Sequence, residues 1–174
     1  MKQKSPMETE LKLRIPATEP LRPRLAALGF REVTPAQAER STLWDREGRL
    51  LAENSALRTR SFAGRSRLTW KGPRVPDALL KIRPELETGI EDGPTLEAIL
   101  RALGFEPTLH MEKVRAVWLR EDLEACLDVT PFGCFLELEG EPGAIHATLA
   151  ELGLDTGAAE TRSYPELFRE AGLG

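Results

Sequence analysis

Hydrophobic and charged positions alternate along residues 7–15. The hydrophobic face carries Leu11, Leu13 and Ile15. The opposite face carries Glu8, Glu10, Lys12 and Arg14. Strict period-two alternation is typical of a β-strand with two unlike faces. One charged face is usually solvated, so this segment alone predicts a strand and no function.

Six later segments repeat the alternation, and Gly, Pro and Asp mark turns between several of them. They span residues 57–60, 68–71, 80–87, 112–118, 125–129 and 135–139. Their charged positions are Arg58, Arg60, Lys71, Lys81, Arg83, Glu85, Glu87, Lys113, Arg115, Asp128, Glu137 and Glu139. Residues 41–51 are predicted as two short extended pieces around a turn at 45–48. Pro84 interrupts its strand, which predicts a bulge or a locally unpaired edge.

Hydrophobic residues at helical spacing predict helices at 19–28, 95–103 and 142–152, with a short closing helix near 163–167. Leu-Gly-Phe ends the first two helices and Leu-Gly-Leu ends the third. This recurrence predicts two related halves. The total is about eight strands, roughly the number at which a closed antiparallel barrel encloses one small ligand. The expected fold class is α+β, an eight-stranded antiparallel β-barrel with helices packed outside.

The composition indicates one soluble domain over residues 1–174, with a core at about 7–168. The formal net charge of −4 argues against a nucleic-acid binder driven by bulk charge. The sequence has no apolar run that could span a bilayer and no apolar signal region near its start, so we expect a cytoplasmic protein without a membrane partner. Cys126 and Cys134 are expected to be buried free thiols.

The function of the charged strand faces depends on whether they point toward water or toward the interior of the protein. On a flat sheet they would face water, but in a closed barrel they would line the interior, where charges need partners. The hydrophobic faces would then lie beneath the helices, at Leu11, Leu13, Ile82, Leu86, Leu136 and Leu138. Arg and Lys side chains suit phosphate oxygens, and carboxylates suit a hard divalent cation. An interior holding both predicts a metal-bound polyphosphate ligand.

The order of these motifs resembles the CYTH superfamily, the triphosphate tunnel metalloenzymes. Glu8-x-Glu10-x-Lys12 is similar to the ExExK signature of that superfamily, which is weak evidence by itself. The match continues in order through Leu57-Arg58-Thr59-Arg60, Leu68-Thr69-Trp70-Lys71-Gly72-Pro73, Arg83-x-Glu85-x-Glu87, Glu112-Lys113-x-Arg115, Leu127-Asp128-Val129, Gly133-x-Phe135-x-Glu137-x-Glu139 and Ser163-Tyr164. The ordered set is specific and covers most of the chain.

The resemblance implies a tunnel that binds a triphosphate together with Mg²⁺ or Mn²⁺. The implied metal ligands are Glu8, Glu10, Glu137 and Glu139, with Asp128 near them and counted with them. The implied substrate-binding residues are Lys12, Arg58, Arg60, Lys71, Arg83, Glu85, Glu87, Lys113 and Arg115. Within this set Glu85 and Glu87 complete the acidic side and orient the basic one. Lys12, Glu137 and Glu139 are the expected catalytic residues, whereas Tyr164 is expected to anchor the C-terminal segment.

The resemblance leaves three functions open. The first is a metal-dependent hydrolase of inorganic or organic triphosphates. The second is a class IV-type adenylate cyclase that makes cyclic AMP and pyrophosphate from ATP, and the third is a catalytically silent polyphosphate-binding module. Class IV cyclases of one kind place a His-Phe pair shortly before ExExK, where this chain has Lys2-Gln3, so we expect the hydrolase. The expected partner is a small-molecule triphosphate, and the expected assembly is a monomer or homodimer.

Overall fold

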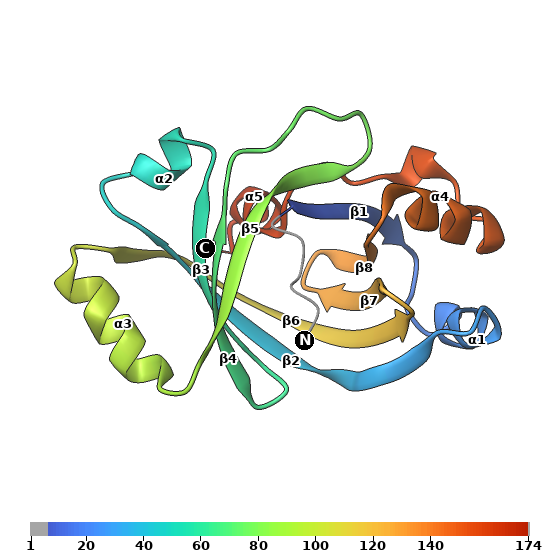
Figure 1. Cartoon of the computed structure of the whole chain (residues 1–174), viewed down its shortest axis with the longest axis horizontal. Helices are drawn as coiled ribbons and strands as arrows, with labels where there is room; N and C mark the ends of the chain where they lie inside the picture. The colour runs from blue at the N-terminus through green and yellow to red at the C-terminus, as the bar shows by residue number, and fades with distance from the viewer. Residues whose placement is uncertain (1–6, 174) are drawn as a thin grey trace.

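The computed structural model describes residues 7–173, so Lys2-Gln3 lie outside the described residues. Its strands form a closed antiparallel barrel in the order β1-β5-β4-β3-β2-β6-β7-β8 (Figure 1). The strands are β1 (Met7–Ile15), β2 (Arg31–Asp45), β3 (Ala56–Phe62), β4 (Arg65–Lys71), β5 (Lys81–Ile90), β6 (Glu106–Arg120), β7 (Leu123–Thr130) and β8 (Gly133–Glu139). The helices are α1 (Leu21–Ala27), α2 (Arg49–Ala52), α3 (Gly93–Ala102), α4 (Pro142–Glu151) and α5 (Tyr164–Glu170), with a 3₁₀ turn η1 (Thr156–Ala158). The predicted α+β barrel is confirmed.

The barrel order also shows the two related halves. Exchanging β1–β4 with β5–β8 leaves the same ring of neighbours, because β1 pairs with β5 and β2 pairs with β6. Strands β2 and β6 are both 15 residues long, and each follows a helix that ends in Leu-Gly-Phe. Gly29 and Gly104 have φ values of 85° and 82°, the left-handed conformation that stops a helix without the steric cost of a Cβ.

The main hydrophobic core lies between the outer face of the barrel and two helices. Leu11 and Leu136 from β1 and β8 pack in one cluster with Leu25 of α1 and Ile145 of α4. All four side chains are fully buried. In Figure 1, α1 and α4 lie together at the end of the barrel formed by β1, β7 and β8. Because the hydrophobic faces of these strands are covered from outside, their charged faces point into the barrel.

Leu86 was expected beneath a helix, and that prediction is wrong. Its residue is 61% exposed, whereas Leu11, Leu13, Leu136 and Leu138 are at most 1% exposed. Ile82, on the same strand, is partly buried against the core. The α1 and α4 helices cover the barrel around β1, β7 and β8, and Leu86 lies away from them next to Trp70 of β4.

The boundaries of β2 and β6 were also predicted too short. Strand β2 begins at Arg31, and its first part was missed because two register shifts, between Glu32 and Gln37, disturb its alternation. After the turn that follows β2, residues 49–52 form α2 rather than an extended piece. Strand β6 begins at Glu106 rather than at residue 112.

Pro84 was predicted to cause a bulge or a locally unpaired edge, and the structure shows no bulge. The β1–β5 register runs without a shift through Glu8–Arg83 to Met7–Pro84, where β1 begins. The β4–β5 pairing ends one residue further on, at Lys71–Glu85. Pro84 therefore lies where both ladders end, and its carbonyl still accepts a 2.8 Å hydrogen bond from the Gly72 N–H. A residue without an N–H interrupts little at such a position.

Cys126 and Cys134 are both free, as expected, but only Cys126 is buried. Cys126 lies opposite Glu137, whereas Cys134 lies opposite Val129, so the two thiols belong to different cross-strand pairs. No helix within residues 7–173 has the length and apolar character needed to cross a membrane.

Candidate functional site: the charged barrel interior

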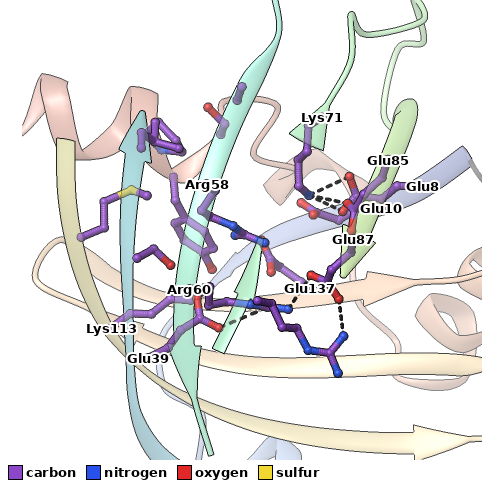
Figure 2. A pocket seen from close by; sticks show the side chains of 18 of the residues that line it. Glu8, Glu10, Glu39, Arg58, Arg60, Lys71, Glu85, Glu87, Lys113 and Glu137 are labelled. Carbon is purple, nitrogen blue, oxygen red and sulfur yellow. Dashed lines mark hydrogen bonds and ion pairs between the residues drawn. The ribbon is translucent and has the colours of Figure 1, made fainter. Parts of the chain in front are cut away.

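The barrel encloses a cavity of about 770 Å³, within the size range of small-molecule sites. Figure 2 shows charged side chains from several strands pointing into it. Its lining includes Glu8, Glu10, Lys12, Arg58, Arg60, Lys71, Arg83, Glu85, Glu87, Lys113, Arg115, Glu137 and Glu139. The structure thus brings these predicted site residues together in one cavity. Asp128 is placed differently, as described below.

The carboxylates at the start of β1 are paired with lysines from β4 and β5. Lys71 Nζ lies 2.7 and 2.8 Å from the two Glu8 carboxylate oxygens and 2.9 Å from Glu85 Oε2 (Figure 2). Lys81 Nζ lies 3.0 Å from Glu10 Oε1. Burial raises the pKa of Glu8 to about 8; Lys71 opposes this shift, while the carboxylates of Glu10 and Glu85 add to it. Burial therefore favours the neutral form of Glu8 more than the nearby lysine favours its charged form.

Further along β1, Lys12 lies directly opposite Glu137 of β8. Its Nζ is 3.2 Å from Glu137 Oε1, and Arg115 contacts the other Glu137 oxygen. Burial lowers the pKa of Lys12 to about 8, although Glu137 opposes that shift. Burial would raise the pKa of Glu137, but Lys12 and Arg115 hold it well below its usual range. Glu137 is therefore a carboxylate that stays ionised in a buried site.

Glu39 of β2 is a site residue that the sequence analysis missed. It is 3% exposed and lies 3.5 Å from Arg60, 3.5 Å from Lys113 and 3.8 Å from Arg115, measured between charged atoms. Burial disfavours its charged form, but Lys113 and Arg115 lead the cations that lower its pKa to about 2. The alternation of Gln37, Glu39 and Ser41 was the available signal, and it was overlooked with the first part of β2.

Asp128 lies behind the cations rather than on the cavity wall. It is fully buried, and Arg115 donates to its two carboxylate oxygens at 2.7 and 2.6 Å. Lys113 Nζ also donates to it at 2.9 Å. The Tyr164 hydroxyl, from α5, donates at 2.6 Å. Every oxygen of Asp128 thus holds a neighbouring side chain in place, and Tyr164 joins α5 to the site.

Arg83 and Glu87, two further predicted site residues, form hydrogen bonds within the protein. Arg83 donates from Nε and Nη2 to the Gly72 carbonyl at 2.9 and 2.7 Å, so it secures the segment after β4. Glu87 accepts from Arg60 at 3.0 Å and from Thr69 at 2.9 Å, and it also contacts Arg67. Both side chains are therefore engaged in holding other parts of the site.

Arg58 differs from the other cations of the cavity. Its Nε is buried and has no hydrogen-bond partner within the described part of the chain. An unsatisfied buried donor on a guanidinium is unfavourable unless an anion binds it. This atom fits an anionic ligand in the cavity.

The carboxylates fit a divalent cation by the chemistry of their donors. Glu10 lies directly opposite Glu139 across β1 and β8, next to the facing pair Lys12 and Glu137. Carboxylate oxygens without His or Cys are the ligands that Mg²⁺ and Mn²⁺ prefer. Among residues 7–173, no three Asp, Glu, His or Cys side chains form a ready-made metal-binding group. Ligation would therefore need the carboxylates to exchange their present lysine partners for the ion.

The comparison with known families covers all of the predicted site residues. The CYTH domain matches residues 6–164. The chain belongs to the CYTH family. The resemblance noted from the ordered motifs is thereby confirmed, and the CYTH enzymes to which it points are adenylate cyclases or triphosphatases with a charged tunnel. Enzymes of this tunnel type generally depend on divalent metals.

The names of individual CYTH relatives refer to adenylate cyclase and to triphosphatase activity. A Methanocaldococcus jannaschii protein named as a candidate adenylate cyclase is 33% identical over 134 residues, 76% of each chain. A solved Vibrio parahaemolyticus structure, also named as a candidate adenylate cyclase, has a TM-score of 0.81 at 21% identity and covers 95% of this chain and 99% of its own. A Hippeastrum protein, described as a candidate adenylyl cyclase with a dominant triphosphatase activity, has a TM-score of 0.65 at 20% identity, covering 94% and 96%.

Proposed function

We propose that this CYTH protein is a divalent-metal-dependent hydrolase of triphosphate-containing substrates, either inorganic or organic. The observation that carries the proposal is the two-sided charge of one enclosed cavity. Carboxylates from β1 and β8 face each other in register, while guanidinium and ammonium groups come from β3, β4 and β6. A triphosphate with a bound cation matches both kinds of charge at once.

The cationic side would hold the phosphate oxygens. The residues assigned to it are Lys12, Arg58, Arg60, Lys71, Lys113 and Arg115. Within residues 7–173, each of these except Arg58 forms an ion pair with a carboxylate. A bound triphosphate would offer oxygens to the same groups, so substrate binding exchanges internal ion pairs for charge-assisted bonds to phosphate. The Arg58 Nε, which has no hydrogen-bond partner within the described residues, would gain one from phosphate, so we expect Arg58 to contribute strongly to affinity.

The acidic side would hold Mg²⁺ or Mn²⁺ through Glu8, Glu10, Glu137 and Glu139. When bound, the metal would neutralise phosphate charge and lower the pKa of a water that attacks the terminal phosphoryl group. Asp128 was predicted among the ligands, but its four close donors support a positioning role toward Lys113 and Arg115 instead. Glu85 and Glu87 similarly orient Lys71 and Arg60.

The second candidate function is an adenylate cyclase, because the Methanocaldococcus jannaschii relative is named as one. The cavity would have to place the ribose hydroxyl of ATP at the innermost phosphorus for this reaction. Hydrolysis makes a smaller demand, since it needs water at the terminal phosphorus and no positioned ribose hydroxyl. The absence of the His-Phe pair at Lys2-Gln3 also supports the hydrolase.

An incubation series tests the proposal. Tripolyphosphate, thiamine triphosphate and ATP are each incubated with the protein and Mg²⁺ or Mn²⁺, and phosphate, pyrophosphate and cyclic AMP are measured. We expect phosphate release that stops in chelator and returns with either ion. We expect Glu139→Ala to lower kcat by orders of magnitude, which excludes a contaminating phosphatase. Cyclic AMP with pyrophosphate would establish the cyclase, and no turnover of any substrate would leave a binding module.

A further inference from the structure

The first residue of α5 carries a side chain that the proposed function does not use. Tyr164 reaches from the C-terminal helix into the charged cavity, where its ring lies beside two of the phosphate-binding lysines. Lys12 Nζ lies 3.5 Å from the ring centroid, and Lys113 Nζ lies 4.0 Å from it. Such distances are well inside the range of a cation–π contact, which strengthens when the cation is desolvated. Both lysines are buried.

The two lysines are held in the same way. Among residues 7–173, Lys12 has two oxygen contacts, Glu137 at 3.2 Å and the Arg162 carbonyl at 3.4 Å. Lys113 also has two, Asp128 at 2.9 Å and Glu39 at 3.5 Å. An ammonium group has three N–H donors, so each lysine keeps one donor beyond these contacts. The third donor of each ammonium can point at the ring face, which attracts the positive charge.

The ring itself is held rigidly. Its hydroxyl donates to Asp128 at 2.6 Å, and Phe135 packs edge-on against it with the ring centroids 5.5 Å apart. Phe135 is fully buried. The same aromatic cluster continues through Phe132 to Phe168 of α5, with centroid distances of 5.9 and 5.0 Å. Tyr164 is therefore fixed at both its hydroxyl and its ring edge.

We infer that Tyr164 is a positioning residue for substrate binding. Its ring holds the ammonium groups of Lys12 and Lys113 at a fixed separation, where phosphate oxygens would replace their present oxygen partners. The C-terminal helix thus completes the phosphate-binding site of the barrel. This inference rests on the proposed function for the identity of the ligand, and on contacts within the protein for the position of the lysines.

The first measurement needs no ligand. Aromatic ring currents shift protons that lie over a ring face to higher field, so the Hε resonances of Lys12 and Lys113 should lie upfield of those of exposed lysines. Assignment uses Lys12→Arg and Lys113→Arg. We expect the upfield shifts to persist in Tyr164→Phe and to vanish in Tyr164→Leu. Ordinary lysine shifts in the parent protein would overturn the inference.

The second measurement is tripolyphosphate binding by calorimetry in chelator, where no turnover occurs. We expect Tyr164→Leu to weaken binding by about tenfold and Tyr164→Phe to stay within about threefold of the parent, because Phe keeps the ring. Phe168→Leu is the matched control, since it removes an aromatic ring from α5 that contacts neither lysine. Equal losses in Tyr164→Leu and Phe168→Leu would mean that helix packing is responsible, and would overturn the inference. So would a Phe variant as weak as the Leu variant.

A parent protein that does not bind tripolyphosphate would contradict the proposed function instead. The proton shifts would then still decide whether Tyr164 positions the two lysines. The two proposals therefore fail on different observations.

Discussion

At the scale of single residues, the site consists of buried charged side chains that contact partners of opposite charge. Glu39 faces three cations, Asp128 holds two cations and a phenol, and Glu137 contacts Lys12 and Arg115. Removing one member of such a buried set is strongly destabilising, because it leaves the remaining charge uncompensated. Residues that hold other residues are therefore as important to this site as those that touch the ligand.

The prediction at this scale concerns Glu39→Gln. The depressed pKa of Glu39, about 2 against an ordinary 4.5, corresponds to roughly 3 kcal/mol of unfolding free energy at neutral pH. Because the folded pKa is the lower one, this stabilisation is present above the ordinary pKa and is lost as the pH falls through the depressed value. The difference between parent and variant should therefore shrink below about pH 4.5. Urea unfolding at neutral pH and in steps down to about pH 3 measures it.

Glu112→Gln is the control for this prediction. Glu112 pairs with Arg40 at 2.7 Å on the outside of the barrel, where both side chains are more than half exposed. Exposed ion pairs contribute about 0–1 kcal/mol, so this variant should be close to the parent at every pH. A Glu39→Gln protein as stable as Glu112→Gln at neutral pH would contradict the role assigned to Glu39.

At the scale of secondary-structure elements, the seven-residue helix α5 determines the position of Tyr164 in the site. A capping box begins the helix, in which Ser163 and Glu166 exchange hydrogen bonds with each other's backbone N–H groups. Arg74, in the β4–β5 connection, adds bonds to Glu166 at 2.8 Å and to the Thr161 carbonyl at 3.2 Å. These contacts determine where Tyr164 lies, because it is the first residue after the cap.

The element-scale prediction compares two helix caps. Ser163→Ala should lower the free energy of unfolding by about 1 kcal/mol and also weaken tripolyphosphate binding, because α5 positions Tyr164. Asp92→Ala removes the N-cap of α3, whose side chain accepts from the Thr95 N–H, and should have a similar effect on stability. It should leave binding unchanged. Thermal melts and metal-free calorimetry measure the two effects, and equal binding losses in both variants would refute a special role for α5.

At the scale of the whole molecule, the closed barrel explains how one small domain holds so many buried charges. Strands β1 and β8 present their hydrophobic faces outward to the main core and charged side chains to the enclosed cavity. The halves repeat this arrangement, so β1 and β5 both contribute carboxylates next to lysines. A triphosphate in the cavity would contact strands from both halves and link them.

The whole-molecule prediction follows from this linkage. Tripolyphosphate in chelator, at about a hundred times its dissociation constant, should stabilise the folded protein by about 2.7 kcal/mol. For a chain of this length that is a rise in melting temperature of roughly 5–10 °C. Orthophosphate at the same concentration should raise it far less, because it spans fewer of the cations. Equal shifts with the two anions would mean that the cavity does not recognise an extended polyphosphate.

Alternation and turn residues were enough to predict the class of fold and most of the charged side chains that line the cavity. Period-two alternation shows which side chains share a face whatever the strands pair with, so Arg58 with Arg60 and Glu137 with Glu139 could be placed together from sequence alone. The turn and helix-stop residues likewise marked most element boundaries, and the two Leu-Gly-Phe sequences indicated the repeat.

Which charges contact one another could not be predicted from the alternation. A contact across strands depends on register, and a slip of one residue moves every side chain to the other face. The pairing of Glu39 with Lys113 follows from the β2–β6 register after two shifts, which no local pattern predicts. Tyr164 contacts Lys12 because α5, which is far from β1 in the sequence, packs against the barrel. Leu86 is exposed because none of the described helices covers that part of β5. These features depend on long-range packing, whereas alternation is a property of each strand alone.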